Sequence, residues 1–204
     1  MPKKVCVLDY GSGNVMSVYN MIKYLGFDVK ISNSIKDINL SSHIILPGVG
    51  SFSASMKKIR EKIPLKVVER NIINQKKPFL GICVGMQVLS DYGHEFEKSE
   101  GLGWIGGNVK KIKNPKVKIP HIGWNNIRII NNNNLLKDCQ DENFYFVHSF
   151  SINGIKKSEI ASYTNYGDDF ISSINKDNIY GVQFHPEKSQ TGGLLLCENF
   201  LNKC

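Results

Sequence analysis

The chain of 204 residues lacks a long apolar run, a paired-cysteine motif and an excess of acidic residues. Without a run of about 18 apolar residues, it is not expected to cross a membrane. The N-terminal Met1-Pro2-Lys3-Lys4 and the short apolar segment after it end at Asp9, too short for a signal peptide, so we expect a cytoplasmic protein. The five cysteines are odd in number and none forms a Cys-x-x-Cys pair, which argues against a disulfide scaffold or a zinc site.

Basic residues outnumber acidic ones by 26 to 18, which gives a formal net charge of +8. Such an excess raises the question of a nucleic-acid partner. The basic residues are spread along the chain, however, and the densest stretch, 110–118, alternates with apolar residues as a strand with one solvated face would. A lysine-rich surface explains the charge better than a groove for phosphates, so we expect no nucleic-acid partner.

Short apolar segments alternate with amphipathic ones through the first half of the chain. They predict strands at 5–9, 28–32, 43–46 and 78–82, and helices at 14–25, at 53–74 with a break near Pro64, and at 84–90. This alternation predicts an α/β fold with an open, mostly parallel twisted sheet flanked by helices.

The second half of the chain has a different character. Short alternating segments at 101–130 predict a smaller antiparallel ribbon, followed by a loop at 131–134. Strands at 144–147 and 179–184 and a closing helix at 192–202 complete the pattern. No repeat or linker divides the chain, so we expect a single domain over residues 1–204.

The sharpest local signal is Gly81-Ile82-Cys83-Val84-Gly85, which places a cysteine between a predicted strand and a predicted helix. This is the arrangement of a nucleophile elbow, with cysteine in place of serine. Larger side chains at the two glycines would clash across so sharp a turn. The start of the helix would stabilise a thiolate and offer the free N–H of Val84 to an oxyanion. A buried structural cysteine beside a tight turn is the alternative.

A thiolate nucleophile needs an imidazole that moves protons, and the imidazole needs a partner that orients it. Near the C-terminus, His185-Pro186-Glu187 follows an apolar segment, and an extended backbone would put the histidine and the glutamate on one side. Taken alone the tripeptide could be a surface turn. Together with the cysteine elbow it predicts a Cys83–His185–Glu187 triad.

A third motif, Pro47-Gly48-Val49-Gly50, lies at the end of the third predicted strand. Glycines there would let backbone N–H groups approach a ligand closely, as a second oxyanion donor must. An ordinary strand-to-helix loop is the alternative.

With these motifs the chain resembles the class I, triad-type glutamine amidotransferases. Within that class it resembles the family of glutaminase subunits of imidazole glycerol phosphate synthases. The motifs that carry the resemblance run nearly from end to end: Asp9-Tyr10-Gly11-Ser12-Gly13-Asn14, Leu46-Pro47-Gly48-Val49-Gly50, Gly81-Ile82-Cys83-Val84-Gly85-Met86-Gln87, Pro120-His121-Ile122-Gly123-Trp124-Asn125, Tyr145-Phe146-Val147-His148-Ser149 and Gly181-Val182-Gln183-Phe184-His185-Pro186-Glu187-Lys188-Ser189.

The resemblance implies a role for each matching residue. Cys83 would attack the side-chain amide of L-glutamine, and His185, oriented by Glu187, would act as general base and then acid. The oxyanion would be held by backbone N–H groups among Gly48, Val49 and Val84, and the Gly48-Val49 segment would be a switch. The amino-acid end of the substrate would be held by Gln87, Glu95, His148, Ser149 and Phe150.

The resemblance also implies a partner. The chain is too short to contain a synthase barrel of about 250 residues, so a separate (β/α)8 cyclase subunit would form a heterodimer with it and receive the ammonia for histidine biosynthesis. Interface residues would be Asn14, Trp124 and Lys188. No metal or redox cofactor is implied.

Other functions remain open from the sequence alone. The same glutaminase chemistry could supply an amidotransferase that builds amidino sugars, because the acceptor binds to the other subunit. A non-catalytic interaction scaffold is possible in principle, but an intact Cys83, His185 and Glu187 argue against it. A cysteine peptidase or lipase-like hydrolase fits the elbow but not the His-Pro-Glu spacing.

Overall fold

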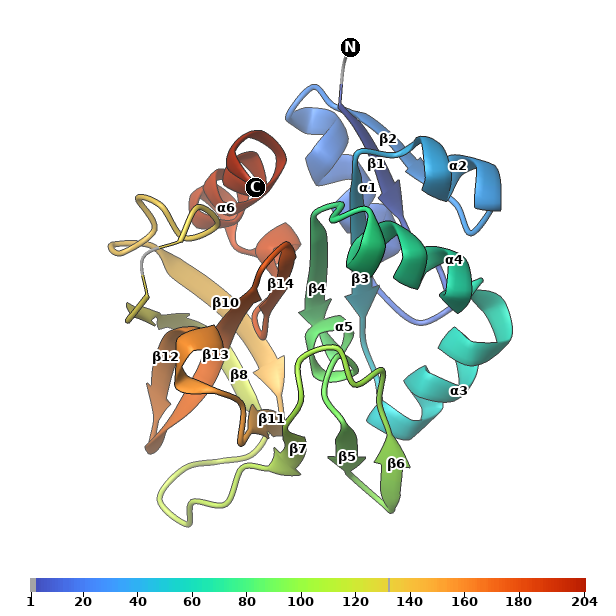
Figure 1. Ribbon diagram of the computed structural model, residues 1–204. Helices are drawn as coiled ribbons and strands as arrows, with labels where there is room; N and C mark the ends of the chain where they lie inside the picture. Colours follow the sequence, from blue (N-terminus) through green and yellow to red (C-terminus); the bar gives the residue numbers. More distant parts are fainter. Residues whose placement is uncertain (1–2, 132) are drawn as a thin grey trace.

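The computed structural model describes residues 3–131 and 133–204. An eight-stranded sheet forms its centre, in the order β2-β1-β3-β4-β14-β13-β12-β9 (Figure 1). The strands from β2 to β14 are parallel and the remaining pairs are antiparallel. The predicted α/β fold with an open, mostly parallel sheet is therefore confirmed. None of the described helices is long and apolar enough to pass through a bilayer.

The strands of the central sheet are β1 Lys4–Val7, β2 Asp28–Ile31, β3 His43–Gly48, β4 Phe79–Cys83, β9 Arg128–Ile129, β12 Ile160–Tyr166, β13 Asp168–Lys176 and β14 Ile179–Val182. Every residue of β3, β4 and β14 is buried, as expected of parallel strands that are covered on both faces. These three adjacent strands form the middle of the core.

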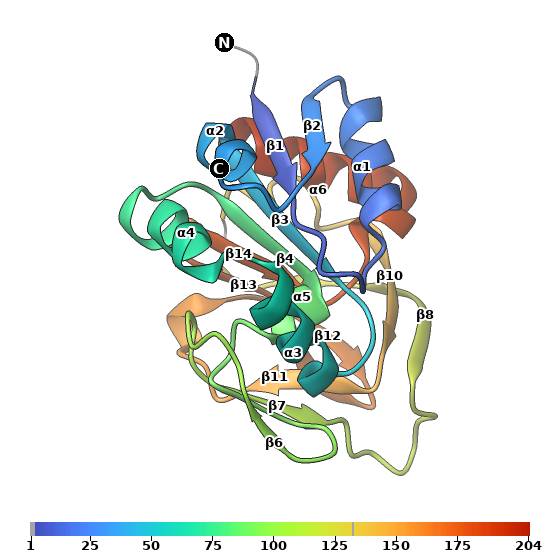
Figure 2. The same ribbon diagram turned by 90° about the vertical axis from the view of Figure 1, so that its right-hand side faces the viewer.

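Helices cover both faces of the sheet. They are α1 Val15–Tyr24, α2 Ile35–Leu40, α3 Phe52–Lys62, α4 Leu65–Glu69, the π-helical turn η1 Arg70–Asn74, α5 Val84–Gln87, the 3-10 turns η2 Lys157–Glu159 and η3 Pro186–Lys188, and α6 Gln190–Lys203. Viewed along the sheet, α1 and α6 lie on one face and α2 and α4 on the other (Figure 2).

Two smaller sheets lie near the carboxyl ends of the central parallel strands (Figure 1). One pairs β8 His121–Asn126 with β10 Asn143–His148. The other contains β5 Tyr92–His94, β6 Lys98–Glu100, β7 Asn108–Lys111 and β11 Phe150–Asn153, in the order β11-β7-β5-β6. Most of their pairs are antiparallel, in agreement with the predicted ribbon, but β5 and β7 are parallel.

The predicted helix over 53–74 is three segments, α3, α4 and η1. The break falls at Pro64, as predicted, because proline has no N–H for a helical bond. The short helix α2 was not predicted. It buries only Ile38, so its apolar pattern is weak, and the Ser34 hydroxyl caps it by accepting from the N–H of Asp37 at 3.1 Å.

The helix after Cys83 is shorter than the predicted 84–90. Beyond Gln87 the backbone continues in tight turns, since carbonyl groups of residues 88–90 accept from the loop at 102–105 instead. Examples are the bonds from the N–H of Leu102 to the Val88 oxygen at 2.8 Å and from Trp104 to the Leu89 oxygen at 2.9 Å. Contacts between distant segments decide where this helix ends.

The predicted strand over 110–118 is wrong beyond Lys111, where β7 ends. Asn114 folds the following segment into a turn by accepting from the N–H of Lys116 at 2.8 Å and donating to Asp168 at 2.8 Å. The hairpin of β12 and β13 was not predicted. Of the predicted loop at 131–134, residue 132 lies outside the described residues, and the other three belong to no helix or strand.

His43, at the start of β3, is a buried imidazole far from the carboxyl end of the sheet. The residue is 3% exposed, and its ring lies edge-on to Phe200 of α6, with ring centroids 5.2 Å apart. Burial, together with the nearby Lys3 charge, lowers the pKa of His43 to about 4. The folded chain therefore favours the neutral ring.

We predict that acid weakens the fold through this residue. The stabilisation is present above the unfolded-state pKa of 6.5 and is lost as the pH falls through about 4, because the unfolded chain binds the proton more readily. The free energy of unfolding, measured with urea, should fall by about 2–3 kcal/mol more in the wild type than in His43→Gln over that range. His94→Gln, at an exposed position, should behave like the wild type. Identical pH dependence of the wild type and His43→Gln would contradict the assignment.

Candidate active site

Cys83 is the last residue of β4 and stands at a sharp turn into α5. Its backbone has φ +54° and ψ −111°, an unfavourable conformation for a residue with a side chain. A Cβ atom on Gly81 would lie 2.5 Å from the Gly85 oxygen, and one on Gly85 would lie 1.9 Å from the Leu46 oxygen. The predicted need for glycine on both sides of the elbow is confirmed.

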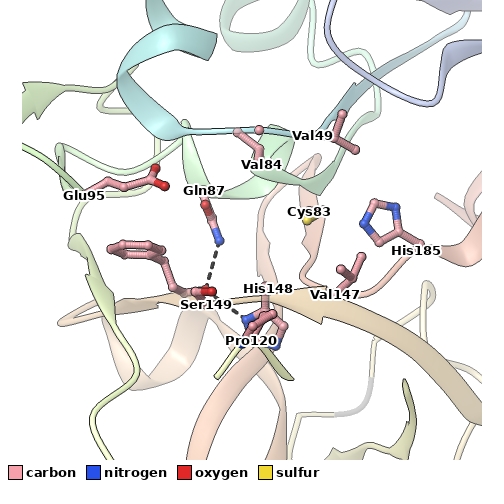
Figure 3. Close-up of a pocket in the computed structure, with 12 residues that line it drawn as sticks. Val49, Cys83, Val84, Gln87, Glu95, Pro120, Val147, His148, Ser149 and His185 are labelled. Atoms are coloured by element: carbon pink, nitrogen blue, oxygen red, sulfur yellow. Dashed lines mark hydrogen bonds between the residues drawn. The ribbon is translucent and has the colours of Figure 1, made fainter. Parts of the chain in front are cut away.

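The two strands beside β4 supply the rest of the site. The register of β3 pairs Gly48 directly with Cys83. On the other side, β14 pairs Val182 with Ile82, so that the chain leaving β14 reaches His185 close to the elbow. The Gly48–Val49 segment and His185 therefore come from the two opposite neighbours of β4 in the sheet, and Val49 and His185 both lie near Cys83 (Figure 3).

His185 and Glu187 form a buried pair, with side chains 2% and 1% exposed. Nδ1 of the imidazole lies 2.7 Å from the carboxylate Oε1, so this nitrogen donates to Glu187. Nε2 has no hydrogen-bond partner among the described residues and is left for a substrate or the Cys83 thiol. Burial acts to lower the pKa of His185, but Cys83 and Glu187 outweigh it and raise that pKa to about 10.

The triad carboxylate has a further partner. Asn14, just before α1, donates to Oε1 of Glu187 at 3.3 Å, and its own oxygen accepts from the Ser17 hydroxyl at 2.8 Å. The sequence predicts Asn14 as an interface residue. The structure places it against Glu187 of the buried His185–Glu187 pair.

A pocket of about 370 Å³ opens in front of Cys83 and His185 (Figure 3). This volume is typical of a small-molecule site. Nine of the predicted residues line it: Val49, Cys83, Val84, Gln87, Glu95, His148, Ser149, Phe150 and His185. Gly50, which ends the predicted Pro47-Gly48-Val49-Gly50 motif, also lines it, and Pro120 and Val147, to which no role was assigned from the sequence, complete the lining.

Glu95 is the one carboxylate in the described lining, which includes no lysine or arginine. It lies between β5 and β6, and its Oε2 accepts from the backbone N–H of Phe52 at 2.7 Å. That bond fixes the carboxylate at the start of α3. An anionic group at this end of the pocket suits a ligand with an ammonium group.

Gln87 lines the pocket, and Gln183, which does not, contacts it. Nε2 of Gln87 donates to the Phe150 carbonyl and to Oε1 of Gln183, both at 3.0 Å. Nε2 of Gln183 lies 3.6 Å from the Cys83 sulfur. Gln183 was not singled out from the sequence, although a polar residue inside the apolar segment before His185 was a signal that could have identified it.

His148 is engaged on both ring nitrogens. Nδ1 lies 2.9 Å from the Phe150 carbonyl oxygen and Nε2 lies 3.1 Å from Nδ1 of His121. Burial lowers the pKa of His148 to about 4, and also lowers that of His121 to about 4. Two neutral rings satisfy both contacts, and His148 faces the pocket with no free ring nitrogen.

The other two predicted interface residues lie close to the triad. Lys188 is exposed, and its Nζ lies 5.7 Å from the centroid of the Tyr145 ring. Trp124 is 49% exposed and meets the same ring edge-on, with centroids 6.0 Å apart. Lys188 and Trp124 therefore both lie against Tyr145, and Asn14 lies against Glu187, the residue before Lys188; we refer to Asn14, Lys188 and Trp124 as the strip.

Comparison with known proteins places this geometry in a family. Residues 6–204 match glutamine amidotransferase class-I. Imidazole glycerol phosphate synthase subunit HisH 2 of Methanococcus maripaludis is 41% identical over 201 residues, which cover 98% of this chain and 99% of the relative. Imidazole glycerol phosphate synthase subunit HisH of Leptospira borgpetersenii is 43% identical over 199 residues, which cover 95% and 97%.

Solved structures agree on the fold. The PurLQS structure from Thermotoga maritima matches with a TM-score of 0.75 at 18% identity, over 99% of both chains. At that identity the match supports the architecture alone, whereas the sequence relatives span nearly the whole chain at more than twice that level. The chain belongs to the class-I glutamine amidotransferase family and, within it, to the HisH subunits of imidazole glycerol phosphate synthases.

Proposed function

We propose that this chain is the glutaminase subunit of an imidazole glycerol phosphate synthase, which hydrolyses L-glutamine to glutamate and ammonia for histidine biosynthesis. The observation that carries the proposal is the pocket in which Cys83 stands beside the buried His185–Glu187 pair. Residues 1–204 act as a single catalytic domain. As a subunit of a biosynthetic enzyme, the protein works in the cytoplasm.

The reaction begins with attack of the Cys83 sulfur on the side-chain carbonyl carbon of glutamine. The new C–S bond places negative charge on the carbonyl oxygen, which the backbone N–H of Val84 and one from the Gly48–Val49 segment stabilise. His185, which carries on Nε2 the proton taken from the Cys83 thiol before the attack, then gives that proton to the nitrogen, the C–N bond breaks and ammonia leaves. Glu187 holds the imidazole in the tautomer and orientation that this transfer requires.

Water completes the turnover. Nε2 of His185, now unprotonated, takes a proton from a water molecule as its oxygen attacks the thioester carbonyl. The C–S bond breaks, its electron pair returns to the sulfur, and glutamate is released.

The far end of the pocket selects an amino acid. Glu95 fits the α-ammonium group, and Gln87, Ser149 and Phe150 surround the same end with polar groups and backbone. Nδ1 of His148 donates to the Phe150 carbonyl, and the His148 side chain forms part of the pocket wall. The side-chain amide of glutamine then reaches Cys83.

Ammonia is consumed by a partner. We propose a heterodimer with a separate (β/α)8 cyclase subunit, which docks on the strip of Asn14, Lys188 and Trp124 and receives ammonia through the interface. The HisH relatives are each named as a subunit of a synthase, which supports a partner of this kind.

Cys83→Ala should abolish glutamate release. Loss of the thiol removes the nucleophile, while the alanine methyl group fits the space that the Cβ atom already occupies. Glutamate can be measured with a coupled dehydrogenase assay and folding by thermal unfolding. Activity close to that of the wild type in Cys83→Ala would refute the mechanism.

Glu187→Gln should lower kcat about 100-fold with a small change in KM, because the amide no longer stabilises the imidazolium. The substitution also removes the anion that raises the pKa of His185, so that pKa, followed by NMR, should fall from about 10. Glu198→Gln, at an exposed position in α6, is the matched control. An unchanged kcat in Glu187→Gln would show that the carboxylate has no part in turnover.

The partner is tested by adding it. Glutamate release by the purified chain should rise strongly when the cyclase subunit from the same genome and its nucleotide substrate are present. Lys188→Ala and Trp124→Ala should weaken this stimulation. No stimulation of a folded, active chain would exclude the histidine pathway and direct the search to an amidotransferase for amidino sugars.

A further inference from the structure

A continuous series of hydrogen bonds leads from the Phe150 carbonyl to the nucleophile. It passes through Gln87 and Gln183 and ends at the Cys83 sulfur, with contacts of 3.0, 3.0 and 3.6 Å. Both side chains are buried, and Gln183 is 0% exposed. The main chain of Gln183 is also fixed, because its N–H donates to the Ser172 carbonyl at 2.9 Å.

The direction of each bond follows from the first. A backbone carbonyl only accepts, so the Gln87 atom that faces Phe150 must be its NH2 group. The same NH2 group faces one atom of the Gln183 carboxamide, which must then be the oxygen. The remaining NH2 group of Gln183 is thereby turned toward sulfur.

We propose that Gln183 is a catalytic residue that donates a hydrogen bond to the Cys83 thiolate. The proposal rests on the function above, in which Cys83 is the nucleophile. Hydrogen bonds to an ionised acceptor are stronger than neutral ones, so the donor favours the thiolate over the thiol. It acts twice in each turnover, before the sulfur attacks glutamine and again when the C–S bond breaks and the electron pair returns to sulfur.

Three titratable groups also lie around the Cys83 sulfur. His185 interacts with the Cys83 charge from the chain after β14, with Glu187 behind it, and Tyr10 interacts with it from the chain after β1. Gln183 differs from all three because it carries a donor whose protonation does not change with pH. It is also absent from the pocket lining and contacts the substrate-holding residues only through Gln87, so its loss should affect the chemistry much more than glutamine binding.

The test compares two substitutions. Gln183→Glu keeps an oxygen for Gln87 but replaces the donor with a second oxygen, and Gln183→Met removes the donor without adding charge. We expect the rate of Cys83 alkylation by iodoacetamide at pH 7 to fall about tenfold in Gln183→Met, and further in Gln183→Glu. The pH of half-maximal alkylation should rise by about one unit. kcat should fall about tenfold with KM within about twofold.

Mass spectrometry assigns the alkylated residue, and Cys83→Ala gives the background from the other cysteines. Gln75→Met, at an exposed position, is the matched control and should leave all rates unchanged. A lower kcat with an unshifted alkylation profile would mean a merely structural role and overturn the proposal, as would wild-type rates in both variants. If Gln183→Met does not fold, Gln183→Glu alone decides. Failure of glutamine to protect wild-type Cys83 from alkylation would instead refute the proposed function.

Discussion

The site depends on the parallel alignment of three adjacent strands. Since β3, β4 and β14 all run in the same direction, their carboxyl ends meet at one edge of the sheet, where ligands bind in open α/β folds. Residues far apart in the chain, Gly48, Cys83 and His185, thereby come together. A one-residue slip in either pairing would turn alternate side chains to the opposite face and separate them. The buried, branched side chains of these strands keep the register in place.

Much of this arrangement follows from local sequence. Strand-helix alternation predicts the parallel sheet, and the glycines beside Cys83 predict the elbow, because each signal lies within a few residues. The failures have a common cause in long-range contacts. The helix after Cys83 ends early because the loop at 102–105 takes its carbonyl bonds, and the segment after Lys111 turns because Asn114 reaches Asp168. Gln183 was not predicted as a site residue, because its contact with Gln87 joins positions 96 residues apart in the chain.

Several buried polar atoms without partners lie close to Cys83. Among the described residues these include Nε2 of His185, Oε2 of Glu187 and the hydroxyl of Tyr10. A buried polar group that lacks a hydrogen bond costs free energy, and folded chains rarely retain several together without a reason. The strained backbone of Cys83 lies in the same region. The unpaired polar atoms and the strained backbone lower the stability of the fold at this site. Such a cost is expected where polar groups are positioned to bind a substrate and transfer protons.

The bond from Asn14 to Glu187 joins the turn before α1 to the catalytic centre. That turn is held from its other side by Lys58, whose Nζ donates to the Ser12 hydroxyl at 2.6 Å. Any partner that moves the turn would therefore also disturb the carboxylate that is hydrogen-bonded to His185. Coupling of this kind is thermodynamically reciprocal. If docking tightens the hold on glutamine, then glutamine must tighten the hold on the partner by the same factor, and an occupied subunit would be slower to dissociate than an empty one.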